Sequence, residues 1–563
     1  MKEKIFIYQL LPRLFGNKSE ANIKNGSIQE NGSGKFNDIT SDLLEKLNKS
    51  GYTHIWYIGV IAHASTTDYT SYGIPQEYPE IIKGKAGSPY AIRDYYDVDP
   101  DLADNIINRM SEFEELIART HKAGLKAIID NVPNHVARNY KSTNKPATVK
   151  DFGEDDDNMK SFSSQNNYYY LPDQRLDIQL SLDKKESFNY TEFPAKVTGN
   201  DCFTNKPTQY DWYETVKLNY GIDYQNALTS HFNPIPDTWT KMKDILLFWA
   251  DKKVDGFRCD MAEMVPIEFW KWSIPQIKAK YPEIIFIAEI YNPSQYRNFI
   301  DKNCFDYLYD KVGLYDVLRD VSCGYRPSSD ISFTLNNVGD IQDKMLNFME
   351  NHDEQRIASD YFLRDGLKGK AAMITTCCIN KNPVMIYSGQ EFGEKGMDEE
   401  GFSGKNGRTT IFDYWSVDTL RRWNNEGGWN YELLTSEEKQ LSLFYSKLIT
   451  LCNQEKSISQ GLFYDLMQAN YDNQNFDSTR LFAFLRGSAD DILLVIVNFD
   501  RLDKECSVYI PKHAYTFLNK EVSGKGKLTP LLENGKEIAF TENQLINIKV
   551  GAHSGNIFRI NFT

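Results

Sequence analysis

Gly256-Phe257-Arg258-Cys259-Asp260 is the stretch around which the chain is organised. It predicts a buried strand that ends in a cation and a carboxylate two residues apart. Side chains at i and i+2 of a strand share one face, so Arg258 and Asp260 can project into the same site. A nearby guanidinium lowers the pKa of a carboxyl group, and an ionised, aimed carboxylate is what a nucleophile requires. A structural ion pair at a strand end is the alternative, and the rest of the chain decides between the two.

Further strand-like segments precede and follow this one, with amphipathic helical patterns between most of them. They cover residues 5–10, 54–58, 126–130, 284–289, 305–309, 345–349 and 384–391. Strands that alternate with helices imply right-handed βαβ units and a parallel sheet. With residues 256–260 as the fourth strand, the pattern predicts an α/β fold of the (β/α)8 TIM-barrel type.

Two parts of the chain depart from this alternation. Residues 137–216 are polar, aromatic and irregular, and they are too many for a loop, so we expect an inserted subdomain after the third strand. Residues 461–563 carry short strand patterns, which predict an all-β C-terminal domain of the β-sandwich type. The barrel is then expected in two parts, residues 1–136 and 217–460.

The bulk composition excludes several classes of binding partner and site. The net charge is −14, which argues against nucleic acid or an anionic membrane because both bind basic surfaces. None of the eight cysteines forms a CxxC pair, so neither a zinc site nor a disulfide framework is predicted. No apolar stretch is long enough to span a membrane. Without a signal peptide in the chain as given, we expect a cytoplasmic protein, or a periplasmic or secreted one if a signal was removed. The oligomeric state stays open.

Polar side chains follow the carboxyl ends of four predicted strands, which is where barrels place their chemistry. These residues are His135, Arg258, Asp260, Glu289, His352 and Asp353. Two carboxylates that flank a glycosidic bond, one ionised and one protonated, are the groups that hydrolyse it. Arg258 stands beside Asp260, which we therefore expect to be ionised. Glu289 ends an apolar strand with no cation adjacent in sequence, so burial should suit it to be the general acid.

The chain resembles the α-amylase family of glycoside hydrolases. Four motifs carry the resemblance in the family's order, and they are Asp130-Asn131-Val132-Pro133-Asn134-His135, Gly256–Asp260, Phe286-Ile287-Ala288-Glu289 and Asn351-His352-Asp353. The resemblance covers nearly the whole length, including the insertion and the C-terminal domain.

The resemblance implies that Asp260 is the nucleophile, Glu289 the acid/base and Asp353 a third carboxylate that binds sugar hydroxyls. Carboxylates about 5–5.5 Å apart would mean retention through a covalent glycosyl-enzyme. It also implies supporting roles: one residue orients Asp260, two bind the sugar by hydrogen bonds, and one stacks on its ring. These are, in turn, Arg258, His135 with His352, and Tyr90, which stands four residues before Asp94.

A fifth stretch, Val216–Asn219, resembles the motif of neopullulanases and cyclomaltodextrinases, which accept α-1,4 and sometimes α-1,6 bonds in short glucans. Such relatives usually carry an extra N-terminal domain, whereas this chain starts at the first strand. Glu263 and Met264 stand where endo-acting α-amylases have Lys-His. We expect Asn219 and Glu263 at the substrate, and Trp212 with Tyr168–Tyr170 to wall the cleft. Weaker binding of the leaving chain then predicts a preference for short substrates.

No cofactor is required for this chemistry. Asn134 occupies the position that ligates a structural calcium ion in many family members, so a Ca²⁺ site is expected there if the chain has one. The family's Asp-rich calcium loop after the first strand is matched by residues 31–38, which lack most of those carboxylates.

The sequence leaves three functions open. The first is a retaining hydrolase of α-1,4 bonds in malto-oligosaccharides, starch or pullulan, with cleavage of α-1,6 bonds left open. The second is a transglycosylase or glucosyl isomerase, which uses the same residues and excludes water. The third is a catalytically inactive carbohydrate-binding protein, which the presence of all three carboxylates argues against.

Overall fold

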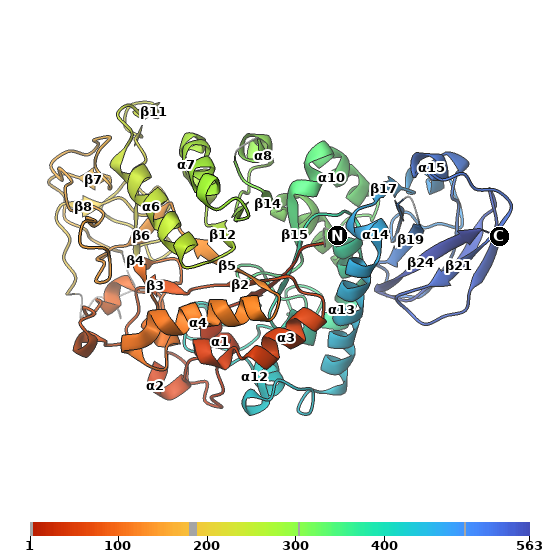
Figure 1. The fold of residues 1–563 in the computed structure, drawn as a ribbon, viewed down its shortest axis with the longest axis horizontal. Coiled ribbons are helices and arrows are strands. Elements are labelled where there is room, and N and C mark those ends of the chain that lie inside the picture. The colour runs from red at the N-terminus through yellow and green to blue at the C-terminus, as the bar shows by residue number, and fades with distance from the viewer. Residues whose placement is uncertain (1–3, 180–188, 302–303, 489–490, 563) are drawn as a thin grey trace.

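A closed barrel of parallel strands forms the centre of the computed structural model, which describes residues 4–179, 189–301, 304–488 and 491–562 (Figure 1). The strands follow one another around the barrel in the order β1, β16, β15, β14, β13, β12, β5 and β2. Their bounds are β1 Phe6–Leu10, β2 His54–Tyr57, β5 Lys126–Asn131, β12 Gly256–Cys259, β13 Ile285–Ala288, β14 Tyr307–Tyr309, β15 Met345–Phe348 and β16 Val384–Tyr387. The predicted TIM barrel is confirmed.

Helices surround this barrel, and the amphipathic ones bury an apolar stripe. In α3 (Ser41–Lys49), for example, Leu43, Leu44 and Leu47 face inward, and the Thr40 side chain caps the first turn by accepting from the Leu43 N–H. The other long helices are α4 Arg109–Lys122, α6 Asp237–Asp251, α7 Ile267–Lys280, α9 Asp316–Cys323, α10 Asp330–Val338, α11 Lys370–Cys378 and α13 Ser436–Gln454. Shorter ones are α1 Pro12–Phe15, α2 Ile28–Asn31, α8 Tyr296–Ile300, α12 Asp418–Asn424 and α14 Lys456–Ser459.

The register of three adjacent strands brings the functional motifs together. Arg258 in β12 lies opposite Asp130 in β5 and Ile287 in β13. One residue beyond the strand ends, the Asp260 N–H still donates to a β5 carbonyl at 2.8 Å, and the Glu289 N–H donates to the Cys259 carbonyl at 3.1 Å. Asp260 and Glu289 therefore leave the barrel side by side at its carboxyl rim.

Two short antiparallel pairs of strands lie at that rim. β3 (Ile61–His63) pairs with β4 (Ile92–Val98) after the second barrel strand. β6 (His135–Ala137) pairs with β9 (Thr215–Lys217), so the chain between them leaves the barrel and returns at one place.

The segment between β6 and β9 has a core of its own. It contains β7 (Tyr170–Leu171) and β8 (Ala195–Lys196), and its buried residues include Tyr169, Ile178 and Val197. β10 (Ile222–Asp223) and β11 (Thr229–Ser230) follow β9. In Figure 1 β7 and β8 lie at the left end of the molecule, opposite the C-terminal strands.

The C-terminal part is built on a six-stranded antiparallel sheet, which confirms the expected β character. Its strands are β17 Leu462–Asp465, β18 Leu481–Gly487, β19 Ile492–Asn498, β24 Ser554–Phe562, β21 Lys525–Pro530 and β22 Ile538–Thr541. A second pair joins β20 (Lys504–Val508) to β23 (Ile546–Val550), and one short helix, α15 (Lys512–Phe517), follows β20. Helices α11 and α14 contact this sheet, and its apolar residues continue the barrel's core.

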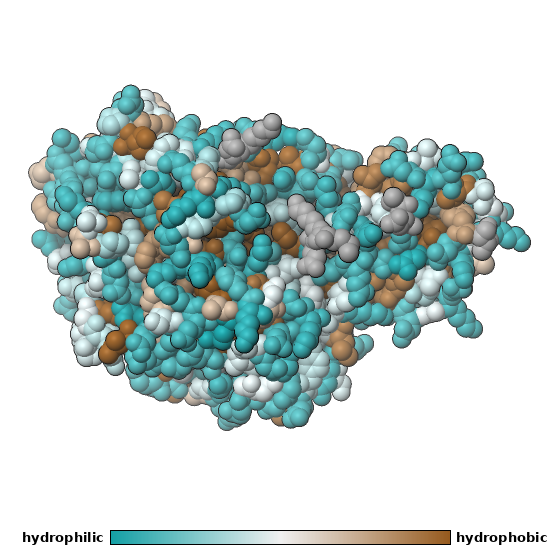
Figure 2. Space-filling model, viewed as in Figure 1, coloured by the Kyte–Doolittle hydropathy of each residue, from teal (hydrophilic) through white to brown (hydrophobic). Residues whose placement is uncertain are grey.

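Hydrophilic residues cover most of the face seen in Figure 2, and hydrophobic ones appear there in small separate groups, as on ordinary folded domains. In the described part of the chain, no helix combines the length and the apolar character that crossing a bilayer demands.

Candidate active site

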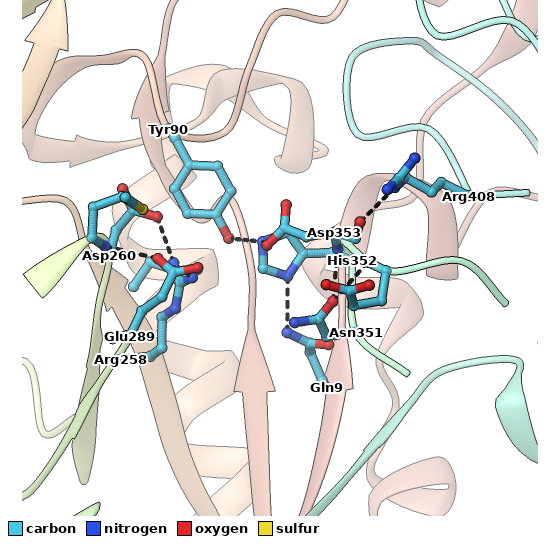
Figure 3. Close-up of polar contacts among 12 residues, drawn as sticks. Gln9, Tyr90, Arg258, Asp260, Glu289, Asn351, His352, Asp353 and Arg408 are labelled. Carbon is cyan, nitrogen blue, oxygen red and sulfur yellow. Dashed lines mark hydrogen bonds and ion pairs between the residues drawn. The ribbon is translucent and has the colours of Figure 1, made fainter. Parts of the chain in front are cut away.

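Arg258 lies at the centre of the site and is fully buried. Its Nη1 is 2.7 Å from Asp260 Oδ1 and 3.4 Å from Asp130 Oδ1, and its Nη2 is 2.7 Å from Glu289 Oε2 (Figure 3). Rings pack around the guanidinium, with centroids 5.3–5.4 Å away, and they belong to Trp56, Tyr90 and Tyr309. One cation is thus shared by three carboxylates in an aromatic enclosure.

This arrangement corrects the electrostatic argument made from the sequence. Glu289 has no cation beside it in sequence, but strand pairing places Arg258 against it as closely as against Asp260. Burial raises the pKa of Asp260 well above its ordinary value, Glu289 and Asp130 raise it further, and Arg258 only partly opposes them. The expectation that the neighbouring Arg258 keeps the pKa of Asp260 low is therefore wrong for the free site. Three carboxylates facing one guanidinium favour retention of a proton among them.

The two central carboxylates differ in their donors. Among the described residues, Arg258 alone donates to the Asp260 side chain, and it donates to Oδ1. In the described part of the chain, Oδ2 therefore has no competing donor. Glu289 has donors on both oxygens, because Oε2 accepts from the Met261 N–H at 2.7 Å and Oε1 accepts from the Tyr291 hydroxyl at 2.7 Å. Since a phenol can donate or accept, Tyr291 tolerates a proton on Oε1. Asp260 is thus the better placed nucleophile and Glu289 the better placed proton carrier.

A second group lies across the site at the end of β15. His352 Nε2 is 2.6 Å from the Tyr90 hydroxyl and 3.0 Å from Asp353 Oδ2, and its Nδ1 is 3.1 Å from Gln9 Nε2. The Tyr90 ring also stacks on the imidazole at 5.3 Å, so it lies between the two groups in Figure 3. The ring of His352 is held at both nitrogens.

Asp353 is the most exposed of the three predicted catalytic carboxylates, with 40% of its side chain accessible. Burial of the carboxyl acts to raise its pKa, but His352, Arg258 and Arg408 outweigh that effect and leave the pKa below its ordinary value. Asp353 therefore stays ionised, unlike the crowded group around Arg258.

These side chains open into one cavity of about 350 Å³. It is lined by Lys83, Ser88, Tyr90, His135, Trp212, Glu214, Thr215, Asp260, Met261, Glu289, Tyr291, Asp353, Ile411 and Phe412. Trp212 comes from the inserted segment and lies 5.2 Å, centroid to centroid, from the ring of His135. Burial lowers the pKa of His135 to about 3, with Lys217 and Lys83 adding to the effect, so the imidazole is neutral.

Two predicted substrate contacts are not brought to this cavity. Asn219 is fully buried, donates to the Ser163 carbonyl at 2.8 Å and accepts from the Gly221 N–H at 2.8 Å. Glu263 accepts from the backbone N–H groups of Tyr291 and Asn292 at 3.2 and 3.1 Å. Neither side chain lines the cavity, because each is used to hold a loop.

The predicted wall of the cleft is only partly correct. Trp212 lines the cavity, whereas the three tyrosines Tyr168–Tyr170 are buried within the protein and do not line it.

The surroundings of Asn134 do not fit a calcium ion. Its Oδ1 accepts from the ammonium of Lys217 at 2.9 Å, and its Nδ2 donates to the Gly199 carbonyl at 2.8 Å. Calcium takes six to eight oxygen ligands. Within the described ranges, no group of three or more His, Cys, Asp or Glu residues is placed to hold a metal. A fixed positive charge stands where the ion would have to lie.

Sequence reasoning missed several residues of the site. Tyr291 stands two residues after Glu289, and the i, i+2 argument used for Arg258 and Asp260 could have suggested it. Lys83 and Glu214, which form an ion pair of 3.0 Å at the cavity, come from irregular segments whose sequence carries no such signal.

The comparisons with known proteins agree with this architecture. The catalytic domain of the α-amylase family, described as "Alpha amylase, catalytic domain", matches residues 9–461. Alpha-amylase 3 of Dictyoglomus thermophilum is 24% identical over 470 residues, covering 77% of this chain and 81% of that protein. Alpha-amylase MalA of Haloarcula japonica is 22% identical over 468 residues, covering 82% of this chain but only 52% of MalA.

Solved structures share the fold across the whole chain. The noncanonic maltogenic α-amylase AmyB from Thermotoga neapolitana superposes with a TM-score of 0.62 at 18% identity, covering 100% of this chain and 99% of that one. The α-amylase from H. orenii gives the same TM-score of 0.62 at 18% identity, with 100% of both chains covered. At these identities the likeness speaks for the architecture.

Proposed function

The chain belongs to the α-amylase family of glycoside hydrolases, and on that premise we propose that it is a retaining hydrolase of α-1,4-glucosidic bonds in short malto-oligosaccharides. The observation that carries the proposal is the unequal set of donors around two carboxylates that share Arg258. Asp260 lines the cavity with one oxygen that accepts from no donor in the described ranges, and Glu289 has both oxygens held by donors.

In the first step, Glu289 gives the proton on Oε1 to the glycosidic oxygen while Asp260 Oδ2 attacks the anomeric carbon. The bond from that carbon to the leaving oxygen breaks, and a glycosyl ester of Asp260 forms. In the second step, Glu289 takes a proton from water, the water oxygen attacks the anomeric carbon, and the ester bond breaks. Arg258 contacts both carboxylates, so it stays paired as charge moves between them.

The remaining residues bind the sugar around this centre. Asp353 lines the cavity and is placed to accept from sugar hydroxyls, and His135 offers a neutral imidazole there. His352 is bonded at both ring nitrogens and holds Tyr90 and Asp353 in place. Tyr90 lines the same cavity and presents a ring face on which a sugar can stack. Neutral His135 adds no positive charge to the site.

A cavity of about 350 Å³ is at the lower end of the usual range for ligand pockets, which supports a short substrate. Glu263, in the position of the donor that endo-acting relatives use, is occupied with backbone N–H groups instead. The resemblance of Val216–Asn219 to neopullulanases supports α-1,6 bonds as a second linkage.

The test compares kcat/KM for maltotriose to maltoheptaose with that for amylose, and follows the products of maltotriose, starch and pullulan by chromatography. We expect the highest efficiency on the short oligosaccharides, with glucose or maltose among the products. Efficiency that rises with length to a maximum on amylose, with random internal cuts, would show an ordinary endo-amylase.

Transglycosylation is the second candidate. Trp212, Met261, Ile411 and Phe412 line the cavity beside the carboxylates, and apolar walls favour a sugar acceptor over water. Products longer than the substrate, or rearranged products, at low maltotriose concentration would favour this candidate over hydrolysis.

A further inference from the structure

Lys217 is a buried cation outside the catalytic group. Its side chain is 2% exposed, and its Nζ lies 2.5 Å from Asp201 Oδ1 and 2.9 Å from Asn134 Oδ1. A third side of the ammonium faces the ring of Tyr224, 5.4 Å from the centroid. An amide oxygen, a carboxylate oxygen and a ring face thus surround an ion that is almost completely removed from water.

Lys217 and the two residues whose oxygens it binds come from different parts of the chain. Asn134 precedes β6 at the end of the third barrel strand, Asp201 lies within the inserted segment, and Lys217 is on the returning strand β9. The backbones of β6 and β9 pair directly, with His135 opposite Lys217. The ammonium therefore joins the barrel to the inserted segment at the edge of the active site.

The turn that presents Asp201 is pressed against this junction. Asp201 has φ +60°, a left-handed conformation that is uncommon for residues other than glycine and that Asn and Asp tolerate best. A Cβ at Gly199 would lie 2.4 Å from Thr215 Oγ1 and 2.9 Å from His135 Cβ, so only glycine permits this approach. An unfavourable backbone conformation persists where the surroundings hold it in place, and here it carries the counter-charge of Lys217.

We propose that Lys217 takes the structural role that a calcium ion has in many members of the family, so that this chain joins its inserted segment to the barrel without a metal. The ammonium supplies one positive charge to one carboxylate, which balances the junction. A divalent cation would have to displace Lys217 from its two oxygens and then find four more ligands.

Lys217 also affects a residue that lines the cavity. Because Lys217 binds Asn134 Oδ1, the amide nitrogen must face the other way, where it donates to the Gly199 carbonyl and lies 3.2 Å from His135 Nδ1. His135 Nδ1 then accepts, so the ring proton resides on Nε2. Lys217 is thus a positioning residue that sets the amide orientation of Asn134 and, through it, the tautomer of His135.

The first test uses the unaltered protein. Thermal unfolding is followed after exhaustive treatment with EDTA and again with millimolar CaCl2, and calcium binding is measured by isothermal titration calorimetry. We expect the Tm to change by less than about 1 °C and no heat of binding, because a site-bound ion would stabilise the folded state by mass action. A fall of Tm by several degrees in EDTA that calcium reverses would overturn the proposal, whatever the reaction proves to be.

The second test removes the positive charge of Lys217 and keeps the length of its side chain. Lys217→Met should lower the Tm by about 5 °C, because Asp201 and the Asn134 amide lose their buried partner. Lys206→Met is the matched control, since Lys206 is 62% exposed and 3.8 Å from Asp177 in the same inserted segment. Its Tm should move by less than about 1 °C.

The double variant Lys217→Met/Asp201→Asn measures the coupling between the two charges. The fall in its Tm should be smaller than the sum of the falls measured for Lys217→Met and for Asp201→Asn. Equal effects of Lys217→Met and Lys206→Met on the Tm would contradict the proposal. If Lys217→Met does not fold, the EDTA and calcium measurements on the unaltered protein still decide it.

Discussion

Arg258 and Lys217 are two buried cations with opposite charge balances. Arg258 faces three carboxylates, two of them at 2.7 Å, whereas Lys217 faces one carboxylate and a neutral amide. Around Arg258 negative charge is in excess, so a proton is retained and can be moved. Around Lys217 the charges cancel, and the group has nothing to transfer.

The difference shows that one rim of the barrel holds a group suited to catalysis, around Arg258, and a group that only fixes the structure, around Lys217. Clusters that perturb the ionisation of their members mark functional sites, whereas a buried cation balanced by one exposed carboxylate fixes geometry. Substitutions around Arg258 should therefore change the rate with little loss of stability, and substitutions around Lys217 should do the reverse.

The largest expected effect follows removal of a central carboxylate. Asp260→Asn and Glu289→Gln should each lower kcat by about 10³-fold or more, because each group acts mainly in the transition state. The Tm of Asp260→Asn should stay equal or rise, since the variant relieves repulsion among three carboxylates. Steady-state kinetics and thermal unfolding check both parts. Turnover within tenfold of the unaltered enzyme, in either variant, would refute the assigned roles.

A smaller effect is the pH dependence of folding stability that comes from His135, beside Lys217. His135 has its pKa lowered to about 3 in the folded state by burial, then by Lys217 and Lys83, against about 6.5 when unfolded. Between these values the unfolded chain binds the proton, so folding stability must fall as the pH falls below 6.5. Relative to pH 7, this residue alone should cost about 2.5 kcal/mol at pH 4.5.

Denaturant unfolding at pH 7 and pH 4.5 measures that loss. His135→Gln, which cannot titrate, should lose about 2.5 kcal/mol less than the unaltered protein over the same interval. Equal losses in the two proteins would show that His135 is not held neutral. The other buried imidazoles, His54 and His63, remain in both proteins and cancel in the comparison.

The smallest of the three effects belongs to Tyr291. Tyr291→Phe removes the hydroxyl that donates to Glu289 Oε1 at 2.7 Å, and a hydrogen bond of this kind corresponds to about a tenfold change in kcat. KM should change much less, and the basic limb of the pH–rate profile should move. Tyr296→Phe is the matched control, because the Tyr296 hydroxyl is buried without a hydrogen-bond partner among the described residues. If both variants behave alike, Tyr291 does not act on the proton carrier.

The sequence predicted what depends on periodicity and on order along the chain. Alternating strands and helices were enough for the barrel, and the positions after the strands were enough to bring Asp260, Glu289 and Asp353 to one rim. The sharing of Arg258 could not be predicted, because it depends on which strands are neighbours and in which register. The sequence could not show that Asn219 and Glu263 hold loops and do not line the cavity, because a loop residue's position does not reveal which way its side chain turns.

The central claim is that Asp260 forms a bond to the sugar and Glu289 moves the proton. The most direct test treats Glu289→Gln with α-maltotriosyl fluoride, whose leaving group needs no acid, and maps the protein by peptide mass spectrometry. Release of the sugar needs the missing base, so a glycosyl-enzyme should accumulate with one maltotriosyl group on the peptide that contains Asp260. An adduct on another residue, or fluoride released steadily with no adduct at any time, would contradict the account.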